Sequence, residues 1–192
     1  MNRTIMITGI SGCGKSTLIK KIKDEYEIDT MMKFVNPETG KKYNFYTNGQ
    51  SLYILGKYED RTFGGVDSFA PKTAMVDLIE YIKENDRNAI ILCEGWVFKR
   101  YHFDDILFLN PDIETIRQRL YNRSMTSNRK FDNEKFDTNI KKWESFKKSL
   151  VNKWHATLVP YDTKEQMDDA FLKITSEIDD IQQQNSYFDF IQ

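Results

Sequence analysis

The sequence predicts a three-layer α/β fold, in which helices cover both faces of a parallel core sheet of about five strands. The main observation is that short apolar runs typical of buried strands alternate with segments whose apolar residues recur at helical spacing. A second observation is a cluster of turn residues after the first helix, which predicts a small β-hairpin insertion. No repeat or change of composition divides the chain, so we expect one domain over residues 1–192.

The first half of the chain contains the first strand and helix, the insertion and a second helix. The predicted elements are a strand over Thr4–Thr8, a helix from Ser16 to about Glu27, hairpin arms over Met31–Val35 and Lys41–Tyr46, a third strand over Ser51–Gly56, a loop over Lys57–Asp67 and a helix over Pro71–Asn85. The turn residues Asn36–Gly40 separate the two hairpin arms, and residues 31–56 together form the predicted insertion.

The second half continues the alternation of strands and helices. The predicted elements are strands over Ala89–Cys93 and Asp105–Leu109, a helix over Ile113–Arg123, a polar loop over Ser124–Lys130, a long basic helix over Glu134–Trp154, a short strand over Thr157–Pro160 and a helix over Thr163–Gln182. In parallel sheets, ligands bind outside the carboxyl ends of the strands, so the residues that follow each strand are the first candidates for a site.

A phosphate-binding loop follows the first strand. Residues Gly9–Ser16 match G-x-x-x-x-G-K-[ST] at every position and open an amphipathic helix, which is the context that this motif requires. Backbone N–H groups of such a loop surround phosphate oxygens, with Lys15 reaching the β- and γ-phosphates and the Ser16 hydroxyl bound to Mg²⁺. The predicted nucleotide-binding residues here are Gly9, Ser11, Gly12, Cys13, Gly14, Lys15, Ser16 and Thr17. The motif predicts ATP and Mg²⁺ as cofactors.

Two acidic residues are candidates for the chemistry. Glu94 follows the apolar strand expected beside the first one, where a ligand to a magnesium-bound water or a catalytic carboxylate belongs. Asp67 closes the segment Gly64–Asp67, and it is our first candidate for the carboxylate that orients an acceptor hydroxyl and takes its proton. Glu94 is the rival for that role, and a helix cap is the alternative for Asp67.

Through the phosphate loop, the Glu94 strand, the helix that carries Arg119 and Arg123 and the final strand-turn-helix, the chain resembles the P-loop kinases of the nucleoside and nucleotide kinase type over nearly its whole length. The resemblance implies that Arg119 and Arg123 are lid arginines, which contact the nucleotide and stabilise the transferred phosphate. Their i, i+4 spacing puts both guanidinium groups on one helix face. The resemblance also implies that the turn at Asp162 and Thr163 passes near the adenine, while capping of the last helix is the alternative role for both.

Composition and charge say more about the cellular compartment of the protein than about its activity. The chain has 28 Lys and Arg against 29 Asp and Glu, but residues 117–153 hold 11 basic against 4 acidic residues, while residues 161–192 hold 2 against 8. A basic face is compatible with a phosphate-rich substrate, and a solvated helix surface is the alternative. Two cysteines, no signal-peptide pattern and no membrane-spanning apolar run predict a cytoplasmic protein, in host cytoplasm if it is phage-encoded.

The acceptor is the open question, and three alternatives compete. Gly56-Lys57-Tyr58 followed by Gly64-Gly65-x-Asp67 resembles bacteriophage 5-hydroxymethyluracil DNA kinases, which implies transfer of the γ-phosphate to the hydroxymethyl group of that base in DNA. The insertion and the basic helix would then form the DNA-binding face. A nucleoside or nucleoside-monophosphate kinase acting on a free small molecule is the second alternative. A non-enzymatic nucleotide switch is the third alternative. GTPases of that type need a guanine-specifying Asn-Lys-x-Asp segment, and this chain has none at a strand end.

Overall fold

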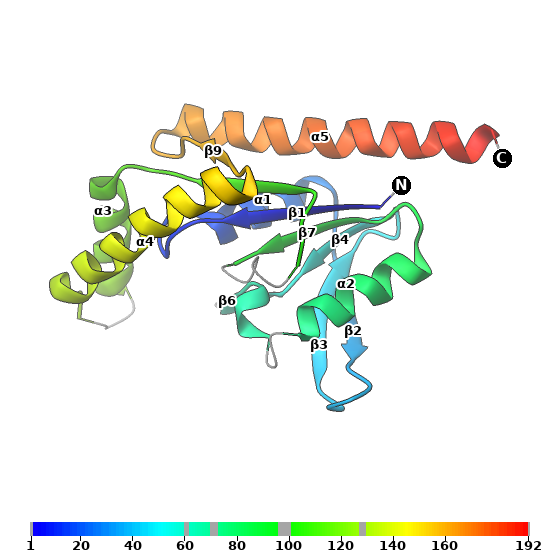
Figure 1. The fold of residues 1–192 in the computed structure, drawn as a ribbon, viewed down its shortest axis with the longest axis horizontal. Helices are drawn as coiled ribbons and strands as arrows, with labels where there is room; N and C mark the ends of the chain where they lie inside the picture. Colours follow the sequence, from blue (N-terminus) through cyan, green and yellow to red (C-terminus); the bar gives the residue numbers. More distant parts are fainter. Residues whose placement is uncertain (1, 60–61, 70–72, 96–100, 127–129, 192) are drawn as a thin grey trace.

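The computed structural model describes residues 2–59, 62–69, 73–95, 101–126 and 130–191 (Figure 1). The strands are β1 (Arg3–Thr8), β2 (Thr30–Val35), β3 (Lys42–Thr47), β4 (Leu52–Leu55), β5 (Lys57–Glu59), β6 (Thr62–Gly64), β7 (Ile90–Glu94), β8 (Asp105–Leu109) and β9 (Thr157–Val159). The helices are α1 (Lys15–Glu25), α2 (Ala74–Asn85), α3 (Ile113–Thr126), α4 (Asn133–Trp154) and α5 (Lys164–Ile191), with a short 3₁₀ helix η1 (Val66–Ser68).

The central sheet has the strand order β2-β3-β4-β7-β1-β8-β9. Strands β4, β7, β1, β8 and β9 pair parallel with one another in that order, and β3 and β2 extend the β4 end of the sheet in antiparallel pairing. The predicted α/β class with a mostly parallel core sheet is therefore confirmed. The strand that precedes the phosphate loop, β1, lies between β7 and β8, so the ends of all three strands meet at one edge of the sheet.

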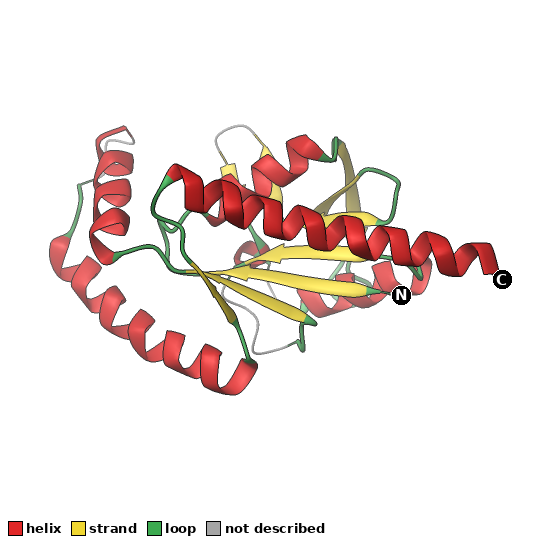
Figure 2. Ribbon diagram, turned by 90° about the horizontal axis from the view of Figure 1, so that it is seen from above, coloured by secondary structure: helices red, strands yellow, loops and turns green. Residues whose placement is uncertain are grey.

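Helices cover both faces of this sheet, which explains the uninterrupted apolar sequence of its central strands. Ile5, Met6 and Ile7 are successive residues of β1 and all are fully buried, so neither face of this strand meets water. Helices α1 and α5 lie against each other on one side, whereas α2 and α4 lie on the other (Figure 2). On that second side, Trp143 of α4 stacks on Phe108 of β8 with ring centroids 5.5 Å apart.

Two predictions about residues 31–67 were wrong in part. The strand assigned to the end of the insertion, β4, pairs parallel with β7 and therefore belongs to the core sheet; only β2 and β3 are added to it. The segment predicted as a loop contains a second hairpin, β5–β6, followed by η1. Each strand of that hairpin has three residues, too few to show a two-residue period in the sequence.

Two helices are longer than the sequence predicted. Helix α3 continues to Thr126, because the hydroxyls of Ser124 and Thr126 donate to carbonyls of the preceding turn and so satisfy polar groups that suggested a loop. Helix α5 continues to Ile191, and the amide of Asn185 anchors this extension by donating to the carbonyl of Asn88 at 3.1 Å. No helix in the described ranges is long and apolar enough to cross a membrane.

Candidate active site

The phosphate loop runs from the end of β1 into α1, as the sequence predicted, and carries Gly9, Ser11, Gly12, Cys13, Gly14, Lys15, Ser16 and Thr17 at that edge of the sheet. Gly14 precedes the first residue of α1 with φ 104°. A Cβ at Gly14 would lie 2.5 Å from Cε1 of Tyr161, so both the conformation and the contact require glycine. The free N–H groups at the start of α1 and its dipole make this edge suitable for an anion.

Lys15 lies folded over its own loop. Its ammonium donates to the carbonyl of Gly9 at 2.9 Å and to that of Ile10 at 3.2 Å. These bonds hold the charge at the mouth of the loop. A bound phosphate would compete for the same donors, because an ammonium binds an anionic oxygen more strongly than a neutral carbonyl.

Glu94 meets the loop through the parallel pairing of β1 with β7, in which Ile7 is opposite Glu94. The hydroxyl of Ser16 donates to Oε1 of Glu94 at 2.8 Å, which brings together the two residues predicted to hold the metal. The Glu94 side chain is buried, with 4% of the residue exposed, and its Oε2 accepts no hydrogen bond within the described part of the chain. Burial and the charge of Asp67 raise the pKa of Glu94, while the charge of Lys15, the Ser16 hydrogen bond and the backbone N–H of Gly65 oppose this shift.

Asp67 lies beside Glu94 because two glycines pack against the two carboxylate-bearing segments. A Cβ on Gly65 would overlap the backbone and side chain of Glu94, and a Cβ on Gly95 would lie 2.8 Å from Oδ1 of Asp67. The backbone of Gly65, just before η1, thus packs on the side chain of Glu94, and the backbone of Gly95, just after β7, packs on the side chain of Asp67. Asp67 itself is exposed, on η1, whereas Glu94 is enclosed. The structure therefore gives the two candidate carboxylates different environments.

Three of the four buried polar side-chain atoms without a partner in the described residues lie at strand ends on this edge of the sheet. They are Thr8 Oγ1, Glu94 Oε2 and Asn110 Oδ1, and the fourth is Trp143 Nε1 on α4. Thr8 and Glu94 end their strands, and Asn110 directly follows β8. Native proteins leave few such atoms unpaired, and a cluster at the carboxyl ends of parallel strands is the pattern of a ligand-binding edge.

The residues at the Ser16 contact fit a magnesium ion. A hydroxyl and a carboxylate are the oxygen ligands that Mg²⁺ prefers, and this ion usually keeps several waters and takes its remaining ligands from substrate phosphates. The unpaired Oε2 of Glu94 supplies an acceptor for such a metal-bound water. No group of three or more His, Cys, Asp or Glu side chains arranged for a metal occurs among the described residues.

Arg119 joins the phosphate loop to the turn after β9. Its guanidinium donates to the carbonyl of Cys13 at 3.1 Å and to that of Tyr161 at 2.8 Å, and it lies 5.7 Å from the centroid of the Tyr161 ring. The predicted nucleotide contact is compatible with this position. The sequence did not single out Tyr161, whose role depends on a contact between segments far apart in the chain. Arg123 lies one turn further along α3 and is exposed.

Asp162 braces the turn that follows β9. Its Oδ1 accepts the N–H of Asp112 at 2.6 Å, and its own N–H donates to Gln166 at 2.8 Å. The N–H of Gln166 in turn donates to the hydroxyl of Thr163 at 3.2 Å, so this pair caps the start of α5. The carboxylate of Asp162 is therefore used to hold the turn, and the adenine contact predicted for it stays a prediction.

Comparison with known proteins gives distant likenesses only. No family model matches the sequence, and no curated protein matches it. A deoxyadenosine kinase from M. mycoides, solved with bound dCTP, has a TM-score of 0.49 and 17% identity over 90% of this chain and 99% of that chain. A shikimate kinase from Bacteroides thetaiotaomicron has a TM-score of 0.43 and 16% identity over 92% of this chain and 98% of its own. Likenesses of this degree carry no argument about the substrate of this chain, which rests on its own residues.

Proposed function

We propose that this protein is an ATP-dependent kinase that transfers the γ-phosphate to an alcohol group. The observation that carries the proposal is the contact between Ser16, the last residue of the phosphate-loop motif, and the buried carboxylate of Glu94, whose second oxygen has no partner in the described chain. A nucleotide-binding loop explains Ser16 alone. A buried carboxylate with an open oxygen beside it is what phosphoryl transfer needs in addition.

The donor side of the reaction is assigned to the loop and to α1. The backbone N–H groups and Lys15 hold the β- and γ-phosphates, while Ser16 and Glu94 hold the metal ion. Magnesium, when bound, neutralises charge on the phosphate oxygens. Arg119 fixes the position of the loop relative to the Tyr161 turn through its hydrogen bonds to both. We keep Arg123 as a residue that reaches the transferred phosphate when nucleotide is bound.

The acceptor side is assigned to Asp67. Its carboxylate is exposed and adjoins Gly95, so an acceptor hydroxyl can approach it from solvent at the edge where Glu94 lies enclosed. The acceptor oxygen attacks the γ-phosphorus, the bond from that phosphorus to the bridging oxygen breaks, and ADP leaves. The hydroxyl proton passes to Asp67. Glu94, facing Ser16 instead, is assigned to the metal.

For the acceptor we propose the hydroxymethyl group of 5-hydroxymethyluracil in DNA, on the resemblance of residues 56–58 and 64–67 and on the exposed lysines of α4. A free nucleoside or nucleoside monophosphate is the second candidate, and one observation favours it. Phe34, Tyr43 and Phe45 of the β2–β3 hairpin are buried, so these aromatic side chains cannot stack on the bases of DNA, although five of the six residues of β2 are exposed.

The test is transfer of label from γ-labelled ATP to acceptors offered in parallel. The panel contains duplex DNA with 5-hydroxymethyluracil, the same DNA with thymine, free nucleosides and nucleoside monophosphates. Label in the modified DNA alone supports the DNA acceptor, and label in a free nucleoside or nucleotide supports the second candidate. Label in none of them, with active ATP binding, would refute the proposed acceptor chemistry for this panel.

A further inference from the structure

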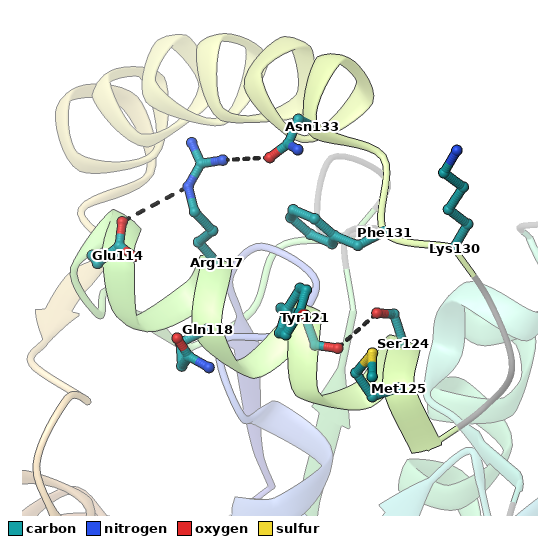
Figure 3. A pocket seen from close by; sticks show the side chains of 9 residues that line it. All are labelled: Glu114, Arg117, Gln118, Tyr121, Ser124, Met125, Lys130, Phe131 and Asn133. Atoms are coloured by element: carbon teal, nitrogen blue, oxygen red, sulfur yellow. Dashed lines mark hydrogen bonds and ion pairs between the residues drawn. The ribbon is translucent and has the colours of Figure 1, made fainter.

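A cavity of about 540 Å³ lies away from the phosphate loop, on the outward face of α3 and against the segment that leads into α4 (Figure 3). Helix α3 presents Arg119 to the loop, and Leu120 fills the space beside Gly12. The cavity is lined instead by residues of the opposite helix face, such as Arg117 and Tyr121. Its volume is that of sites that take small organic ligands, about 300–1,000 Å³.

The wall of this cavity is aromatic and accessible. The rings of Tyr121 and Phe131 meet edge to face, with centroids 6.1 Å apart and planes at 78°. Tyr121 is 47% exposed and Met125, one turn further along α3, is 68% exposed. The exposed ring of Tyr121 offers a flat surface to a planar ligand, and the flexible side chain of Met125 can adapt to the shape of that ligand.

The polar groups at the cavity divide into fixed and available ones. Arg117 is fixed, because it pairs with Glu114 at 3.7 Å and donates to Asn133 at 2.9 Å (Figure 3). It also pairs with Asp137 at 3.0 Å. Lys130 is exposed and forms no ion pair within the part of the chain that the structure describes. It belongs to residues 117–153, which contain 11 basic and 4 acidic residues. The cavity therefore combines an aromatic wall with an uncommitted cation in a basic region.

We propose that this α3–α4 cavity binds a nucleotide, whose base stacks on Tyr121 beside Met125 and whose phosphate pairs with Lys130. An inorganic anion would use Lys130 and leave the aromatic wall unused. A purely apolar ligand would use the wall and leave the cation and the basic region without a role. A base joined to a phosphate uses both, since stacking on an aromatic ring and pairing with a cation are the two contacts that recur where proteins hold unpaired nucleotides.

This site is separate from the transfer site proposed above, and its test needs no turnover. Binding of dTMP and of a short single-stranded oligothymidylate is measured by calorimetry on the full chain. We expect Tyr121→Ala and Lys130→Ala each to weaken binding about 10-fold, in the range that loss of one stacked base gives. We expect Tyr121→Phe to retain it, because the ring remains. The matched controls, Tyr187→Ala and Lys173→Ala on α5, should leave the affinity unchanged.

The same series distinguishes the cavity from the phosphate loop and a free nucleotide from one in a strand. Lys15→Ala should leave the affinity for dTMP at the α3–α4 cavity intact. Much tighter binding of the oligothymidylate than of dTMP would place the ligand in a nucleic-acid strand, and equal affinities would indicate a free nucleotide; both support the site. No binding of either probe to the wild-type chain, or binding lost in Lys15→Ala and retained in Tyr121→Ala, would overturn the proposal.

Discussion

The edge of the sheet that carries the phosphate loop and the outward face of α3 differ in how tightly they are packed. At the sheet edge, Gly14 and Gly65 have no room for a Cβ, and Glu94 is 4% exposed. On α3, Tyr121 and Met125 remain open to solvent beside a cavity. Chemistry requires groups held in place before the substrate arrives, whereas recognition tolerates side chains that adjust. We therefore expect substitutions at the edge to change turnover, and substitutions on α3 to change affinity.

The largest effect is expected at Lys15. Removing its ammonium with Lys15→Ala should lower kcat by about 100- to 1,000-fold, because a preorganised donor to the transferred phosphate is lost. The melting temperature should change little, because the ammonium donates within its own loop, to the carbonyls of Gly9 and Ile10 and to the sulfur of Cys13. Steady-state kinetics and a thermal melt of the same preparation check this. Unimpaired turnover in Lys15→Ala would refute the site.

The next largest effect on kcat is expected for Glu94→Gln, which should lower activity without lowering stability. The amide oxygen can still accept from Ser16, but the charge is gone, so we expect kcat to fall by about 100-fold. Because burial raises the pKa of Glu94, the folded state disfavours its charged form, and the variant should be at least as stable as wild type. A variant that loses both activity and stability would show that Glu94 is a structural residue.

The pH profile follows from the same burial. The wild-type kcat/KM for Mg-ATP should fall on the acid side at a pH above the usual range of a glutamate, because it reports the free enzyme, in which burial raises the pKa of Glu94 and protonation removes a metal ligand. The matched variant Glu94→Gln should lack this acid limb in its residual activity. An identical limb in both proteins would assign the titration to another group.

Asp67→Asn should have a smaller effect, confined to the acceptor half of the reaction. We expect kcat to fall by about 10- to 100-fold with the affinity for ATP unchanged, since Asp67 is exposed on η1 and is assigned to the acceptor hydroxyl. Binding of ATP is measured by calorimetry beside the kinetics. A loss seen in ATP binding alone would move Asp67 to the donor side.

The smallest expected effect lies far from both regions, at the contact between α5 and β8. Burial and the neighbouring carboxylate of Asp105 raise the pKa of Glu177 to about 7. Its contribution to stability is therefore complete below the ordinary glutamate pKa and is lost as pH rises through about 7. Because Glu177 is only half-buried, the melting temperature should drop by no more than about 2–4 °C over that rise. Thermal melts of Glu177→Gln should lack this change.

Much of the fold was predictable because its central strands are buried on both faces. An uninterrupted apolar run such as Ile5–Ile7, or the strand that ends at Glu94, has few alternatives to a core strand of a parallel sheet. The pairing of β4 was missed because strand partners are chosen by long-range contacts that leave no local pattern. The β5–β6 hairpin was missed because its strands are too short for a period to show.

The site was predictable where one segment contains its chemistry, and less so where several segments meet. The phosphate-binding motif can be recognised in eight consecutive residues, and Glu94 was selected by the rule that sites lie at strand ends; the structure places its carboxylate against Ser16. The reciprocal packing of Gly65 on Glu94 and of Gly95 on Asp67 depends on how η1 and β7 approach each other. The same holds for Tyr161 against Gly14. No spacing in the sequence encodes these contacts.

The most direct test of the account is whether consumption of ATP depends on an acceptor. ADP release and phosphorylated acceptor are measured together for wild type and Lys15→Ala, with and without each acceptor of the panel. We expect wild type to form ADP and phosphorylated acceptor in equal amounts, only when a hydroxyl acceptor is present, and Lys15→Ala to form neither at a comparable rate. ATP hydrolysis that proceeds at the same rate without any acceptor would contradict this expectation and indicate a nucleotide switch.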